Sequence, residues 1–293
     1  MNRQMNEFIA YLQEVKQVSN NTSTSYQQDL HKFLAFLKEH QITKLSKVTE
    51  TNIYSYILEL EKNNRSAATI ARTIVSIKGF FSYLMKYRKI SIDPSERIKP
   101  PKVEKKLPQA LSTLQVQSLL ESPDLSTPKG LRDKAMFEIM YATGMKASEL
   151  IELQMDDIDF THGILICRGT KRDRVIPFGE KANYAVKEYL DNGRVRFVGL
   201  QTHSYIFVNQ HGKPMTRQGF WKILKEYAAL LEINELSPQL LRHSFAMHLI
   251  ENGANVNVVG EMLGYTDRSL AYVYTDSKNV RVMEEYNKAH PRV

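Results

Sequence analysis

The sequence predicts a mainly α-helical protein of two domains, with a small antiparallel β-sheet in the second domain. Three observations lead to this fold class. The chain has 293 residues, which is more than a single hydrophobic core usually organises. Apolar residues recur at three- and four-residue spacing along much of it, as in amphipathic helices. A basic, proline-rich stretch, residues 93–111, separates two such regions.

The first domain is predicted to span residues 1–92 and to contain four amphipathic helices. The apolar periodicity places them at residues 6–17, 22–40, 50–63 and 66–87. The expected N-caps of the last three are Thr22, Thr49 and Ser66. Residues 93–111 follow as an extended linker, because four prolines and dense positive charge disfavour regular structure.

The second domain, residues 112–293, is predicted to combine helices with short strands. Ser112 and Gln115 form a capping-box signature ahead of an apolar run. A helix over residues 131–143 is expected to end at Gly144 in the left-handed conformation. Strands are expected at residues 163–167, 173–178 and 205–209, the first two joined by a turn.

Two further helices are predicted from their caps. Thr216 is the expected N-cap of a helix that runs to about residue 231. Ser237, with Pro238 in the first helical position, begins another helix, which Gly253 closes.

The helix that begins at Ser237 carries polar residues near its positive N-terminal end. Gln239 and Arg242 are three residues apart and therefore share a face, whereas His243 is expected to point elsewhere. We interpret His243 and His248 as structural, because neither has an acidic or cysteine partner at metal-ligand spacing.

The excess positive charge lies in the first part of the chain. Residues 1–111 carry 18 Lys and Arg against 10 Asp and Glu, whereas the remaining residues carry 22 of each, and the net charge is +8. Such an excess fits a surface that faces a polyanion, such as nucleic acid. A solvated basic face that keeps the domain soluble is an equally good explanation.

The composition predicts a soluble, cytoplasmic protein. One cysteine, Cys167, cannot form an internal disulfide, which fits a reducing compartment. The N-terminal segment lacks the apolar centre of a signal peptide, and no run approaches the roughly 20 apolar residues of a membrane span. The single cysteine also excludes a cysteine-rich metal cluster, but it leaves a histidine-based metal site possible.

Several motifs occur together along the chain. They are YATGMKASELIEL, RGTKRDRVIPF, HGKPMTRQGFW, LSPQLLRHSFAMHLIENGANVNVVGEMLGYTD, VYTD and HPRV. In this order they resemble the tyrosine recombinases of the phage integrase family, of the Xer type, and the resemblance covers nearly the whole chain. It implies the two-domain tyrosine-recombinase fold, with a helical, SAM-like core-binding domain followed by a catalytic domain.

The resemblance also implies a reaction. In that family a tyrosine hydroxyl attacks a DNA phosphate and forms a phosphotyrosine bond, without a metal or a nucleotide, so the resemblance implies that no cofactor is needed. Two arginines hold the phosphate oxygens, a lysine protonates the leaving oxygen, and two histidines, the second sometimes tryptophan, assist. The matching positions here are Lys146, Lys171, Gln239, Arg242, Tyr265 and Tyr274, with Arg168 as the alternative to Lys171.

Only Arg242 and Tyr274 plainly keep the residue type of the family. Lys146 replaces the first arginine and lacks its planar fork. Gln239 replaces the first histidine and cannot exchange a proton near neutral pH. Tyr265 replaces the second histidine, although its hydroxyl can still bind a phosphate oxygen. The sequence therefore predicts a degenerate site that holds DNA better than it cuts it.

Residues expected to contact DNA occur in both domains. By resemblance, and because helix N-termini bind phosphates, they are Ser25, Tyr26, Arg72, Lys78, Lys146, Lys171, Arg217, Gln218 and Arg242. For those outside the site, a solvated helix face is the alternative. The C-terminal tail, residues 277–293, is expected to pack into a neighbouring protomer, which would give a homo-oligomer on double-stranded DNA.

Three functions fit these observations. The favoured hypothesis is a sequence-specific DNA-binding protein without recombinase activity, which acts as a transcriptional repressor of a phage or other mobile element. The alternative is an active site-specific recombinase that cuts DNA through Tyr274. The third is an accessory subunit of an active recombinase. The sequence leaves open whether a regulatory protein or peptide controls binding.

Overall fold

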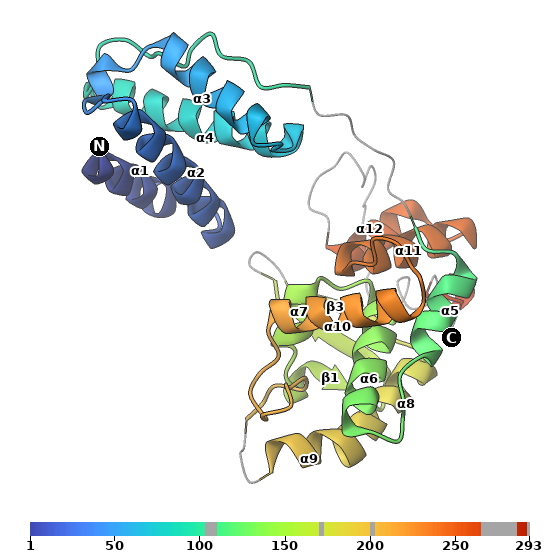
Figure 1. Ribbon diagram of the computed structural model, residues 1–293. Helices are drawn as coiled ribbons and strands as arrows, with labels where there is room; N and C mark the ends of the chain where they lie inside the picture. Colours follow the sequence, from blue (N-terminus) through green and yellow to red (C-terminus); the bar gives the residue numbers. More distant parts are fainter. Residues whose placement is uncertain (103–109, 170–172, 200–202, 265–285, 292–293) are drawn as a thin grey trace. The chain divides into compact units, whose positions relative to one another are not determined.

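The computed structural model describes residues 1–102, 110–169, 173–199, 203–264 and 286–291. Contacts divide the chain into two units, Met1–Lys106 and Leu107–Val293, and both are mainly helical (Figure 1). The division falls inside the segment predicted as a linker. The ends of that segment are nevertheless packed, because Ile98 belongs to the core of the first unit and Leu111 to that of the second.

The first unit contains the four predicted helices. They are α1 (Asn2–Glu14), α2 (Asn20–Glu39), α3 (Glu50–Lys62) and α4 (Ala67–Lys86), with a short 3-10 helix, η1 (Leu45–Lys47), between α2 and α3. Their apolar faces meet in one core, in which Phe33, Phe80 and Leu84 are fully buried. The predicted N-caps Thr49 and Ser66 are confirmed.

The predicted start of α2 is wrong. Ser19, rather than Thr22, is the N-cap, and its hydroxyl accepts a hydrogen bond from the backbone N–H of Thr22. The helix begins before the apolar periodicity does, because a polar first turn needs only a satisfied cap.

In its described residues, the second unit contains eight α-helices, one 3-10 helix, one π-helix and three strands. They are α5 (Thr113–Glu121), α6 (Pro128–Thr143), α7 (Ala147–Glu152), the 3-10 helix η2 (Met155–Asp157), β1 (Ile158–Asp159), β2 (Ile164–Cys167), β3 (Arg174–Pro177), α8 (Glu180–Glu188), the π-helix η3 (Tyr189–Arg194), α9 (Val195–Val198), α10 (Arg217–Leu230), α11 (Pro238–Glu251) and α12 (Val256–Leu263). The caps predicted for α5, α10 and α11 are confirmed.

The sheet is antiparallel, with strand order β1-β2-β3. Leu165 of β2 lies opposite Ile158 and Ile176, which fixes the register on a buried face. The strand predicted at residues 205–209 is wrong, because this stretch forms only isolated bridges at its ends, from Tyr205 and Val208. Its apolar residues are buried without a neighbouring strand to pair with.

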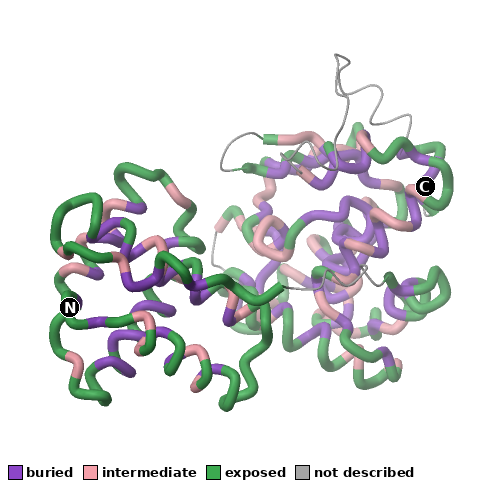
Figure 2. Tube along the Cα trace, turned by 90° about the horizontal axis from the view of Figure 1, so that it is seen from above, coloured by how far each residue is buried: buried purple, intermediate pink, exposed green. Residues whose placement is uncertain are grey.

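Helix α6 is the centre of the second unit. It packs against α5, α8 and α11, and its residues are buried on almost every side, which is typical of a central helix. Figure 2 shows the buried residues of the two units along their helices. The charged side chains inside α6 are paired, Arg132 with Asp133 and Lys134 with Glu138, each pair at 2.8 Å. None of the described helices is long and apolar enough to span a membrane.

Gly144 ends α6 in the left-handed conformation, with φ +60°, as predicted. A Cβ at this position would lie 2.3 Å from Cδ1 of Phe245. We therefore expect Gly144→Ala to lower the free energy of unfolding by about 2–5 kcal/mol, from backbone strain and overpacking together. Gly253→Ala is the control, because φ is +89° but the surrounding space is open, so only strain of about 1–2 kcal/mol applies. Equal losses in urea unfolding would contradict the close contact with Phe245.

Candidate functional site

Arg72, a predicted DNA contact in the first unit, is held in one orientation. Its Nη2 donates to the buried carboxylate of Asp29 at 2.9 Å, and Ser76 donates to the same carboxylate at 3.0 Å. Burial raises the pKa of Asp29, and the positive charge of Arg72 partly offsets this. The side chain of Arg72 remains 45% exposed, so it combines a fixed position with access to solvent.

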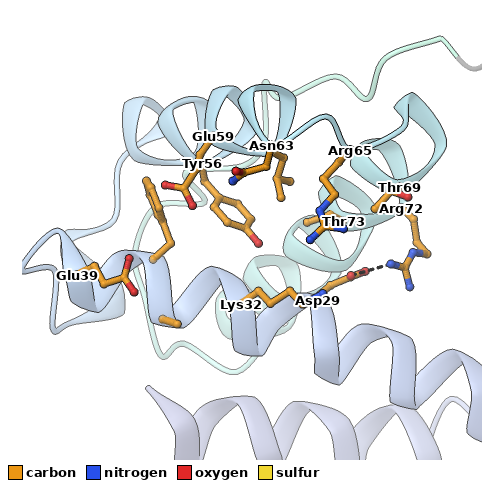
Figure 3. Close-up of a pocket in the computed structure, with 13 residues that line it drawn as sticks. Asp29, Lys32, Glu39, Tyr56, Glu59, Asn63, Arg65, Thr69, Arg72 and Thr73 are labelled. Atoms are coloured by element: carbon orange, nitrogen blue, oxygen red, sulfur yellow. Dashed lines mark hydrogen bonds and ion pairs between the residues drawn. The ribbon is translucent and has the colours of Figure 1, made fainter.

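Arg72 also lines a cavity of about 250 Å³ between α2, α3 and α4 (Figure 3). The charged side chains around this cavity are of both signs: Lys32, Arg65 and Arg72 against Asp29, Glu39 and Glu59. This balance favours neither an anionic nor a cationic ligand.

The other predicted contacts of the first unit are less accessible. Ser25 and Tyr26 are half-buried, and the ring of Tyr26 lies 6.3 Å from that of Phe8, at the edge of the core. Lys78 donates to the carbonyl oxygens of Glu96 and Ile98, both at 2.9 Å. Lys78 therefore fixes the segment that follows α4.

Of the six positions matched to the catalytic site, the structure describes three. Lys146, Gln239 and Arg242 belong to the second unit, whereas Lys171, Tyr265 and Tyr274 lie outside the described residues.

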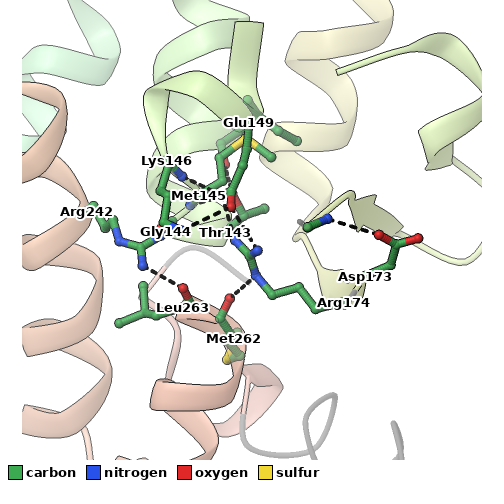
Figure 4. Close-up of polar contacts among 12 residues, drawn as sticks. Thr143, Gly144, Met145, Lys146, Glu149, Asp173, Arg174, Arg242, Met262 and Leu263 are labelled. Carbon is green, nitrogen blue, oxygen red and sulfur yellow. Dashed lines mark hydrogen bonds and ion pairs between the residues drawn. The ribbon is translucent and has the colours of Figure 1, made fainter. Parts of the chain in front are cut away.

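Arg242 connects three helices of the second unit. It lies on α11 and is 2% exposed. Its Nη1 donates to the carbonyl oxygen of Gly144, at the end of α6, at 2.7 Å, and its Nη2 donates to that of Leu263, at the end of α12, at 2.6 Å (Figure 4). These bonds place the guanidinium at the corner where α6 turns into α7.

Lys146 lies at the same corner, two residues beyond Gly144, so the structure brings Lys146 and Arg242 together (Figure 4). Lys146 is the N-cap residue of α7, and its side chain is 54% exposed. Its backbone N–H donates to Glu149 at 2.7 Å, and its Nζ lies 3.7 Å from the same carboxylate. The corner thus holds a buried cation, Arg242, and an exposed cation, Lys146.

A buried ion pair between Glu149 and Arg174 supports this corner and was not predicted. Arg174 on β3 donates from Nη1 and Nη2 to the two carboxylate oxygens of Glu149, at 2.9 and 2.6 Å. Its Nε donates to the carbonyl oxygen of Met262 at 2.8 Å. Arg174 and Arg242 therefore both bind carbonyls at the end of α12, where cations are favourable. No local sequence pattern links residues 25 positions apart.

The hairpin between β2 and β3 carries the two candidates for the catalytic lysine position. Asp173 accepts a hydrogen bond from the backbone N–H of Gly169 at 3.0 Å. Arg168 donates from Nε to Asp157 at 2.7 Å, which raises the pKa of the guanidinium. Because Arg168 is engaged by Asp157, Lys171 is the better candidate, and it remains a prediction.

The expectation that His243 points away from Gln239 is wrong. Gln239 Nε2 lies 3.0 Å from His243 Nε2, because residues four apart on a helix are neighbours. His248, in contrast, is buried, with its ring nitrogens bonded to the hydroxyl of Tyr141 at 2.8 Å and the carbonyl of Leu111 at 2.9 Å. Within the described residues, no group of three or more His, Cys, Asp or Glu side chains could hold a metal ion.

The predicted contacts on α10 are accessible. Arg217 and Gln218 are exposed in the first turn of the helix, and Thr216 caps it by accepting from the N–H of Gly219 at 3.0 Å. Both side chains therefore lie at a positive helix end that can face an anion.

The described part of the tail packs within its own unit. Tyr286 is 1% exposed, and its hydroxyl accepts a hydrogen bond from the N–H of Gly179 at 2.9 Å. Asn252 donates to the carbonyl of Ala289 at 2.9 Å. The expected packing of the tail into a neighbouring protomer stays a prediction.

Comparisons with known proteins match both units of the chain to one family. Residues 109–281 match the model of the phage integrase family, and residues 5–88 match that of the phage integrase N-terminal SAM-like domain. The chain is 39% identical to tyrosine recombinase XerD of Halalkalibacterium halodurans, covering 100% of this chain and 99% of the relative. It is 42% identical to a putative tyrosine recombinase of Caldanaerobacter subterraneus, covering 98% and 97%.

The fold is also similar to solved structures. The Tn1549 transposon integrase in complex with circular intermediate DNA matches with a TM-score of 0.69 and 18% identity, covering 96% of this chain and 98% of that one. At this identity the likeness concerns the fold, and it confirms the predicted two-part helical architecture with a small sheet.

Proposed function

Because this chain belongs to the phage integrase family of tyrosine recombinases, we propose that it is a site-specific recombinase that binds double-stranded DNA and cuts it through Tyr274. The Xer-type relatives, which match over the full length, support this alternative more than the repressor that the altered residues suggested. Recombination joins two DNA sites, so the proposal includes a homo-oligomer on DNA.

The position of Arg242 is the observation that carries the proposal. The guanidinium is buried and held by the carbonyl oxygens of Gly144 and Leu263, beside Lys146 and on the helix that carries Gln239. A cation fixed in this way needs no reorganisation when negative charge develops on a phosphate, which makes its stabilisation of the transition state effective.

The proposed step is a transesterification. The hydroxyl oxygen of Tyr274 attacks the phosphorus and its proton passes to solvent, while a P–O bond to the tyrosine forms and the bond to the 5′ oxygen of the DNA breaks. Lys171 gives a proton to that leaving oxygen. Arg242 and Lys146 balance the charge on the phosphate, and Gln239 donates a hydrogen bond to one of its oxygens.

A second candidate function is specific DNA binding without strand cleavage, as a regulator or as the accessory subunit of an active recombinase. The replaced residues at three of the six positions, Lys146, Gln239 and Tyr265, favour it. Affinity depends on many contacts spread over both units, whereas cleavage depends on one cluster.

A plasmid assay separates the two functions. Duplexes bound by the full-length protein are first selected from a random pool, and two copies of the selected site are placed in one plasmid. We expect the wild type to resolve this plasmid, and Tyr274→Phe to bind the site without resolving it. Binding should weaken steeply between 50 and about 200 mM salt, as several phosphates are neutralised. An intact plasmid despite specific binding would favour the second candidate.

A further inference from the structure

Gln239 and His243 form a side-chain pair on the accessible face of α11. Gln239 is exposed and His243 is half-buried, and the distance between their Nε2 atoms is 3.0 Å. Arg242 precedes His243 on the same helix. The residue proposed to donate to the DNA phosphate therefore has an imidazole as its neighbour, one helical turn away.

The two atoms in contact define the direction of the hydrogen bond. An amide nitrogen carries only donors, so Nε2 of His243 must accept, and the neutral ring must carry its proton on Nδ1. Burial first, and the positive charge of Arg242 second, lower the pKa of His243 below its ordinary value. Since that ordinary value is about 6.5, the ring is mainly neutral at pH 7 and can accept.

We propose that His243 is a positioning residue that orients the amide of Gln239 toward the DNA phosphate. The hydrogen bond to His243 occupies one N–H of the amide and restricts the rotation of an exposed, flexible side chain. The second N–H of Gln239 is then presented to a phosphate oxygen without the full loss of rotamer freedom on binding. The inference rests on the proposed function, which assigns Gln239 to the phosphate.

The positioning role predicts a specific pattern of rescue. His243→Leu removes the acceptor, whereas His243→Gln keeps one, because its Oε1 can take the place of the imidazole Nε2. At pH 8, His243→Leu should weaken specific DNA binding by about 3- to 10-fold, which is the effect expected from the loss of one hydrogen bond. It should slow the formation of the covalent bond between Tyr274 and DNA by a similar factor. His243→Gln should stay within about twofold of the wild type.

The same two variants are also made in a Gln239→Leu background. If His243 acts through Gln239, neither variant has a further effect there, because the two residues are coupled. A loss of equal size in both backgrounds, or the absence of rescue by His243→Gln, would show a merely structural role and overturn the inference.

Titration of His243 by NMR in the full-length protein examines the pair without DNA. Gln239→Leu removes a hydrogen bond that stabilises the neutral ring, so the pKa of His243 should rise. An unchanged or lowered pKa overturns the inference.

If the wild type binds no DNA specifically, the proposed function fails and the role of the pair fails with it. Normal DNA binding that His243→Leu leaves unchanged would overturn this inference alone.

Discussion

Gln239→His is expected to raise the rate of strand cleavage about 10²- to 10⁴-fold, since that is the usual contribution of general acid–base catalysis. The glutamine amide donates a hydrogen bond but exchanges no proton near neutral pH. Position 239 lies in the first turn of α11, on the same helix as the fixed Arg242. The rate is measured as covalent adduct formed per minute on a nicked duplex.

Gln239→Asn is the matched control, because it keeps an amide and adds no titratable group, so we expect no gain. Lys146→Arg restores the planar guanidinium and should give a separate gain of about 10²- to 10³-fold. The two gains need not multiply, because residues in one cluster act as a unit. If neither substitution accelerates cleavage, these side chains do not limit the reaction.

Glu149→Ala is expected to reduce the free energy of unfolding by about 3–5 kcal/mol, because it leaves the buried guanidinium of Arg174 without its partner. The side chains of Arg174 and Glu149 are 13% and 11% exposed. The substitution also removes the acceptor for the N–H of Lys146. Urea unfolding at pH 7 measures the loss.

The stability provided by Glu149 should depend on pH. Burial raises the pKa of this carboxyl, but the hydrogen bonds from Arg174 and the N–H of Lys146 outweigh burial and hold the pKa below its usual range. A lowered pKa in the folded state gives stability that is present above the unfolded value of about 4.3 and lost as the pH falls through the folded value. The difference between wild type and Glu149→Ala should therefore shrink in acid.

Glu152→Ala provides the control for this prediction, because Glu152 lies on the same helix α7 and is exposed. Its effect should stay within about 0.5 kcal/mol. A similar loss for both variants would mean that α7 itself, rather than the ion pair with Arg174, determines the change.

Caps and helical periodicity were readable from the sequence because both are local. Ser66, Thr216 and Ser237 each combine a short polar side chain with a following apolar pattern, and all three are confirmed as N-caps. The apolar run at residues 205–209 was misread as a strand, because a short buried run has the same composition in a strand and in a packed loop. Helices α7, α8, α9 and α12 were not predicted.

The candidate site was only partly predictable. The matched motifs identified Arg242 and Lys146, and the structure brings both to the end of α6. The ion pair between Glu149 and Arg174 depends on tertiary packing across 25 residues, which no local pattern shows. The contact between Gln239 and His243 differs in this respect, because four-residue spacing on a helix predicts it, and the signal was overlooked.

Detection of a covalent bond between Tyr274 and DNA tests the central claim most directly. The full-length protein is incubated with a nicked duplex that carries its selected site, and the products are separated under denaturing conditions and digested for mass spectrometry. We predict a protein–DNA adduct with the phosphate on Tyr274, absent in Tyr274→Phe. A salt-sensitive complex that leaves no adduct, even with Gln239→His and Lys146→Arg combined, would contradict the account and leave a protein that only holds DNA.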